Sequence, residues 1–174
     1  MRGAGVARCW AGFASLGAGL VHAAVVPEHW VEWTVFGAFF AVVAAGQLGW
    51  GLLALGRDRL PLCRLVAAAN VALIVLWAVT RTIGLPVGPD RWTPEAVGAA
   101  DLGSVALEAI VVVAVAVAAW SGRTVTAPRT SGGRVLAGLA AGALVVGLVT
   151  TPALAATSAG EHVHPHGMVG HHGG

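Results

Sequence analysis

Five long apolar runs, separated by short segments rich in charge, proline or glycine, dominate the pattern of this 174-residue sequence. Each run has about the 20 residues that a helix needs to cross the roughly 30 Å apolar core of a lipid bilayer. Backbone amides and carbonyls must pair within the segment in that core, and the runs do not alternate as barrel strands do, so we expect helices. The predicted spans cover residues 6–26, 33–55, 65–85, 100–120 and 135–156.

The predicted fold is an all-α integral membrane bundle at residues 1–156, followed by a flexible polar tail at 157–174. Composition agrees with this prediction, because 57% of the residues are hydrophobic and only 10% are charged. A soluble domain carries about a quarter charged residues. The lipid bilayer is therefore the expected environment, and the scattered arginines form no basic stripe that would bind nucleic acid.

The arginine positions predict how the bundle is oriented. Eight of the ten basic residues precede the first span or lie between spans two and three or spans four and five, which leaves Arg81 and Arg91 for the opposite side. By the positive-inside rule the N-terminus is cytoplasmic, and five spans place the C-terminus outside.

The first candidate site lies at the outer end of the first span. His22 falls inside the span, where an ionisable residue usually faces a cavity or the bundle interior, and Glu28, His29 and Glu32 follow at the boundary. If the chain continues as a helix after Pro27, Glu28 and Glu32 share one face. Imidazole and carboxylate together suit zinc, iron or copper. The alternative is an interfacial polar turn anchored by tryptophan.

The second candidate site joins spans three and four. Asp101 and Glu108 are seven residues apart and share a helix face. A carboxylate at that depth needs a partner, and Arg81 is the cation of comparable depth. Two interpretations stay open: a structural ion pair of Arg81 with Glu108 or Asp101, or a polar cavity that these groups share with His22 and Glu32.

The third candidate is the tail, which is rich in residues that ligate soft and borderline metal ions. Neutral imidazoles on a tether can enclose Cu(II) or Zn(II), and a histidine-rich tract is typical of metal binding. The candidate ligands are His162, His164, His166, Met168, His171 and His172.

Three segments carry a resemblance to a group of proteins: HAAVVPEHWVEW at 22–33, TVFGAFFAVVAAGQLGW at 34–50 and RTIGLPVGPDRWTPEAVGAADL at 81–102. They resemble small multi-spanning membrane proteins of high-G+C Gram-positive bacteria. The resemblance implies a multi-pass protein of the bacterial plasma membrane, and it carries over no catalytic residue.

Together these patterns predict a protein that binds a transition metal, copper or zinc, at its extracytoplasmic face for capture, transfer or transport. A second hypothesis is a structural or accessory subunit of a membrane complex, with other membrane proteins or further copies of itself as partners. A third is a small redox subunit that holds haem or quinone. The sequence has no catalytic motif, so it gives no reason to expect an enzyme.

Overall fold

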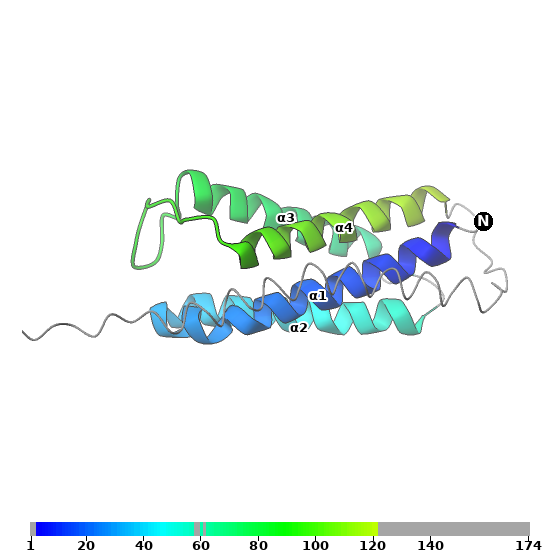
Figure 1. Ribbon diagram of the computed structural model, residues 1–174, viewed down its shortest axis with the longest axis horizontal. Helices are drawn as coiled ribbons and strands as arrows, with labels where there is room; N and C mark the ends of the chain where they lie inside the picture. Colours follow the sequence, from blue (N-terminus) through cyan, green and yellow to red (C-terminus); the bar gives the residue numbers. More distant parts are fainter. Residues whose placement is uncertain (1–2, 58–59, 61, 122–174) are drawn as a thin grey trace, which may run out of the picture.

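The computed structural model describes residues 3–57, 60 and 62–121, and these residues form helices, turns and loops (Figure 1). The helices are α1 (Gly3–Glu32), α2 (Thr34–Gly56), α3 (Cys63–Thr82) and α4 (Ala99–Ser121). All four are long and apolar enough to cross a membrane. They correspond to the first four predicted spans, whereas the fifth, at 135–156, and the tail at 157–174 lie outside the described residues.

The first helix is longer than its apolar run. The sequence predicts that the span ends at Pro27, but α1 continues through this residue to Glu32. Proline lacks the amide hydrogen that would bond to the carbonyl of Ala23, which removes one hydrogen bond without ending the helix here. As a result, His22 and the polar residues after Pro27 belong to one continuous helix.

A single residue, Trp33, connects α1 to α2. Its backbone is extended, with φ −159° and ψ 121°, and its carbonyl accepts a hydrogen bond from the Phe36 amide at 2.8 Å. The two helices then pack closely along their length, because a Cβ added to Gly51 would lie 2.9 Å from the carbonyl oxygen of Gly12. Glycine at these positions therefore permits the close approach of α1 and α2.

The helices are arranged in the spatial order α2, α1, α4, α3. Helix α1 packs against both α2 and α4, and α4 also packs against α3. Helices α2 and α3 do not pack against each other. Small side chains fill the centre of the bundle, where Ala14 and Ala18 of α1 pack in one cluster with Leu107 and Val111 of α4. The α1–α4 contact is thus the centre of the described fold.

The segment 83–98 folds back over the end of α3. Gly84 has φ +73°, and a Cβ there would lie 2.6 Å from the Thr93 amide nitrogen, so this turn requires glycine. The amide of Glu95 donates a hydrogen bond to the carbonyl of Thr80 at 3.0 Å. This fold-back places Glu95 beside the last turn of α3.

Candidate functional site

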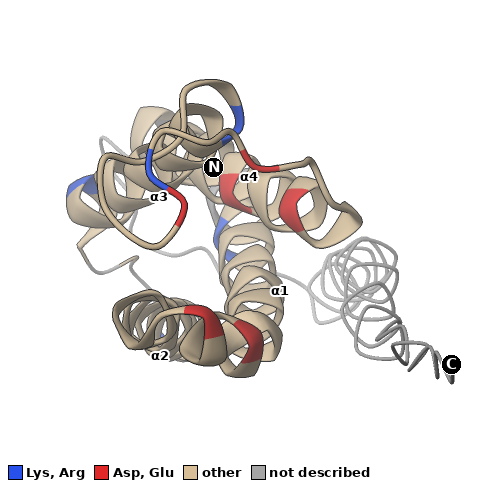
Figure 2. Ribbon diagram, turned by 90° about the vertical axis from the view of Figure 1, so that its left-hand side faces the viewer, with Lys and Arg blue, Asp and Glu red and all other residues tan. Residues whose placement is uncertain are grey.

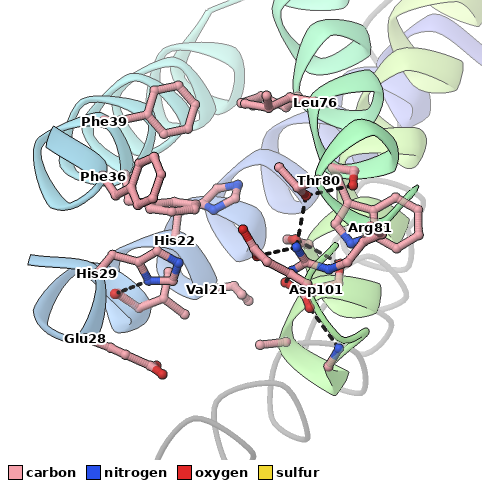
Figure 3. A pocket seen from close by; sticks show the side chains of 18 of the residues that line it. Val21, His22, Glu28, His29, Phe36, Phe39, Leu76, Thr80, Arg81 and Asp101 are labelled. Atoms are coloured by element: carbon pink, nitrogen blue, oxygen red, sulfur yellow. Dashed lines mark hydrogen bonds and ion pairs between the residues drawn. The ribbon is translucent and has the colours of Figure 1, made fainter. Parts of the chain in front are cut away.

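A cavity of about 680 Å³ (Figure 3) lies at one end of the bundle. At this end α1 and α3 end and α2 and α4 begin (Figure 1). All four helices and the 83–98 segment contribute to its lining. The lining residues of α1 are three or four positions apart or adjacent, so one face of this helix forms a wall of the cavity. They are Val21, His22, Val25, Glu28, His29 and Glu32.

Helix α2 contributes an aromatic wall. The cavity is lined by Trp33, just before the helix, and by Phe36, Phe39 and Phe40 in its first two turns. The Phe40 ring lies 5.6 Å from the ring of His22 and 4.3 Å from that of His29. These ring contacts connect the aromatic wall of α2 to the histidines of α1.

The deepest polar contact joins α1 to α4. His22 Nε2 lies 3.0 Å from Glu108 Oε1, and the side chains are 9% and 2% exposed. Gln47 of α2 donates a longer hydrogen bond of 3.5 Å to the same carboxylate oxygen. A buried polar group must find a hydrogen-bond partner to avoid a large free-energy cost, and here three helices supply the partners.

A second polar cluster lies nearer the end of α3. Arg81 Nη2 lies 2.8 Å from Asp101 Oδ1 on α4, and Arg81 Nη1 pairs with Glu95 of the 83–98 segment. The same Nη1 group donates a hydrogen bond of 2.9 Å to Thr80 Oγ1. The planar guanidinium thus bridges α3, α4 and the loop, which suits its fork of donors.

The structure distinguishes the two acids that the sequence offers as partners of Arg81. Asp101 pairs with Arg81, whereas Glu108 pairs with His22. Seven residues of helix, about 10 Å at 1.5 Å per residue, separate the two carboxylates along α4. All four residues line the same cavity, so the ion pair and the shared cavity occur together.

The predicted metal ligands at the end of α1 do not form a cluster. His29 Nδ1 donates a hydrogen bond of 3.0 Å to the carbonyl of Val25, and Glu28 and Glu32 are exposed at the rim. Within the described residues, no three His, Cys, Asp or Glu side chains are placed so that they could hold a metal ion. The tail ligands lie outside the described residues.

Carboxylates outnumber cationic side chains at this end of the bundle. Among the described residues that line the cavity there are five carboxylates, one guanidinium and two imidazoles. Figure 2 views this end and shows acidic segments on α1, on α4 and on the connecting loop. With neutral imidazoles the lining has a formal charge of about −4, so its electrostatic potential favours cations.

Sequence reasoning did not identify Glu95 or the aromatic wall as parts of the site. Glu95 reaches Arg81 only through the turns at Gly84 and Gly88, which no helical period indicates. The aromatic wall has a signal in the sequence, since three of the four phenylalanines lie at 36, 39 and 40.

Comparison of the chain with protein families, curated proteins and solved structures finds no match.

Proposed function

We propose that this protein binds a cation in the cavity at the end of its bundle. The observation that carries the proposal is the Glu108 carboxylate, which is 1% exposed and lines the cavity. Within the described residues its side-chain polar partners are His22 and the more distant Gln47 amide. A carboxylate in a low-dielectric site is stabilised by a nearby positive charge, and the acidic lining attracts one.

A transition metal is the cation that the histidine content favours. We propose copper or zinc, captured by the segment 157–174 and presented to His22, Glu28, His29 and Glu32 at the extracytoplasmic face. The support is compositional, because 157–174 contains five His and one Met. Ligation inside the bundle would require His22 and Glu108 to exchange their mutual hydrogen bond for contacts with the metal.

A structural or accessory role is the second candidate. The contacts of Arg81 with Asp101 and Glu95 favour it, since they connect α3 to α4 and to the loop. In this case the polar end would fix the helix positions, and the partner would be another membrane protein. Such a protein would retain its partner and bind no cation in the cavity.

We also propose a multi-pass location in the bacterial plasma membrane, with a fifth span at 135–156, the N-terminus inside and the C-terminus outside. The apolar run at 135–156 and the uneven arginine distribution support this topology. The cavity would then open toward the extracytoplasmic side.

Cation binding by the purified full-length protein tests the proposed function. Zn²⁺, Cu²⁺ and tetraphenylphosphonium would each be titrated into a variant in which His162, His164, His166, His171 and His172 are replaced by alanine. At least one cation should bind with one site per chain, and Glu108→Gln should weaken that binding at least tenfold. Arg64→Gln, remote from the cavity, should leave it unchanged. Absence of binding by all three cations would refute the proposal.

A further inference from the structure

The cavity has apolar walls on the side where α2 and α3 face each other. Phe36 and Phe39 of α2 lie opposite Leu76 of α3 (Figure 3), and Leu73 extends the same wall. No Cα atom of α2 lies within 8 Å of a Cα atom of α3, so within the described part of the chain these two helices do not pack closely on this side.

The aromatic wall adds a preference for positive charge. Ring faces of phenylalanine and tryptophan attract cations through their quadrupoles, by about 0.5 to 2 kcal/mol. Three of the four phenylalanines line the cavity, and Trp33 and Trp77 line it as well. A hydrated metal ion gains little from such a wall, whereas an organic cation can contact the rings directly.

The polar inner end provides acceptors. Glu108 is one acceptor, and the side-chain oxygen Oε1 of Gln47 is another. This Gln47 oxygen has no hydrogen-bond partner among the described residues, although Gln47 is only 7% exposed. An unpaired buried acceptor is costly in free energy. A positively charged group near Glu108 would also lie close to the Gln47 side chain, which contacts the same carboxylate.

A neutral molecule with carbonyl oxygens, such as a quinone, is the competing occupant. The indole Nε1 of Trp77 has no acceptor among the described residues, and a carbonyl oxygen would satisfy it. The excess of carboxylates over cationic groups in the lining favours the cation, because Glu108 is only 1% exposed and a neutral ligand would bring no positive charge near it.

We propose that the cavity binds a lipophilic organic cation, a quaternary ammonium or phosphonium ion with aromatic or alkyl groups, that reaches it from the bilayer between α2 and α3. This inference rests on the proposed cation-binding function and names the class of ligand. The charge lies near Glu108, and the apolar groups lie between the phenylalanines of α2 and the leucines of α3. The cavity volume of about 680 Å³ is within the range of ligand pockets, about 300 to 1,000 Å³.

Two ions of the same shape and opposite charge test the proposal. Tetraphenylphosphonium and tetraphenylborate would be titrated into the full-length protein in detergent, with a short-chain quinone as the neutral probe. We expect the phosphonium to bind at one site per chain and at least tenfold more tightly than the borate. The quinone should not displace it.

Single substitutions then locate the site. Phe39→Leu removes an aromatic ring that is 38% exposed, so it should leave folding intact and weaken phosphonium binding by about 2- to 30-fold, the range of a cation–π contact. The matched control is Phe13→Leu, because Phe13 is the one phenylalanine outside the cavity lining. Glu108→Gln should weaken the binding further, with thermal unfolding as the check that the variant is folded.

The outcomes separate this inference from the proposed function. Equal affinity for the two ions, displacement by the quinone, or equal effects of Phe39→Leu and Phe13→Leu would overturn the organic-cation assignment. Binding of Zn²⁺ or Cu²⁺ that depends on Glu108, without phosphonium binding, would overturn it and leave the proposed function in place. If none of these cations binds, both fail.

Discussion

His22 on α1 and Glu108 on α4 lie 3.0 Å apart although 86 residues separate them in the chain. His22 is ten residues before the end of α1, and Glu108 is nine residues after the start of α4. At 1.5 Å per residue both lie about 14 to 15 Å from the helix ends. Their equal depth explains why they pair with each other.

The pair predicts a specific pattern in a double-mutant cycle. Either single substitution, His22→Leu or Glu108→Leu, leaves the other residue buried without its partner. Removing one partner of a buried pair lowers the free energy of unfolding by about 3 to 5 kcal/mol. The double variant should recover most of this loss, because an apolar replacement of both partners is often neutral. Thermal unfolding in detergent measures all four proteins. A double variant whose loss equals the sum of the single losses would show that the residues do not interact.

The Arg81 cluster should contribute less to stability than the His22–Glu108 pair. The Arg81 side chain is 12% exposed, but its carboxylate partners are more exposed, with Asp101 at 29% and Glu95 at 50% of the side-chain surface. Solvent-exposed ion pairs contribute about 0 to 1 kcal/mol. Arg81→Met should therefore lower the unfolding temperature less than Glu108→Leu. Salt at about 1 M should reduce the difference in unfolding temperature between Arg81→Met and the wild type, since salt screens exposed charges. An effect that does not change with salt would contradict this account.

Two glycines of α2 should respond in opposite ways to alanine. A Cβ on Gly51 would lie 2.8 Å from Leu16 Cγ and 2.9 Å from the Gly12 carbonyl oxygen, whereas nothing lies within 4 Å of a Cβ on Gly49. Gly51→Ala should destabilise the α1–α2 contact. Gly49→Ala should be neutral or up to about 1 kcal/mol stabilising, because alanine favours a helix. Unfolding temperatures of the two variants check the prediction, and a loss at Gly49 would contradict it.

Reporter fusions test the proposed topology. A reporter after Gly174 should be extracytoplasmic, as should one inserted at Thr93 in the 83–98 segment. A reporter inserted at Leu60, between α2 and α3, should be cytoplasmic, because the arginines there follow the positive-inside rule. Phosphatase activity and fluorescence distinguish the two sides. A cytoplasmic reporter at Gly174 would show that 135–156 does not cross the membrane.

Metal binding by the tail should depend on pH. Protons compete with metal ions for imidazole, so Zn²⁺ and Cu²⁺ affinity at 157–174 should fall as the pH is lowered from about 7 to about 5.5. Replacement of the five tail histidines by alanine should remove this component. Equilibrium dialysis at both pH values measures the change. Equal metal binding with and without the tail histidines would exclude the tail as a metal-capture segment.

The apolar runs were sufficient to predict the helical class and the first four helices, because each run is as long as a bilayer is thick. The depth of His22 was underestimated, because the run ends at Pro27 whereas the helix continues to Glu32. With the helix end at Pro27, His22 appears about 7 Å deep and Glu108 about 10 Å deep. The sequence therefore indicated a cavity that His22 and Glu108 could share, but not the direct contact between them.

Other parts of the site depend on geometry that no periodicity encodes. The loop that leads to Glu95 contains three residues with positive φ, Gly84, Gly88 and Trp92, and their effect on its path is visible only in three dimensions. Asp101 was one of two acids that the pattern allowed for Arg81. The choice between them depends on where α3 ends along the bundle. Arg81 is in the last turn of α3, which lies next to the first turn of α4, where Asp101 is.

The spatial order of the helices has a consequence for how the protein is made. Helix α1 is the first of the four described helices to be synthesised and α4 is the last, yet they are neighbours at the centre of the fold. During translation α1 and α2 are available to form their hairpin while Glu108 has not yet been added to the chain. Until α4 follows, the His22 imidazole lacks its Glu108 partner, and an ionisable side chain without a partner inside lipid is costly. The polar site is completed only in the late steps of membrane insertion, when α4 arrives next to α1.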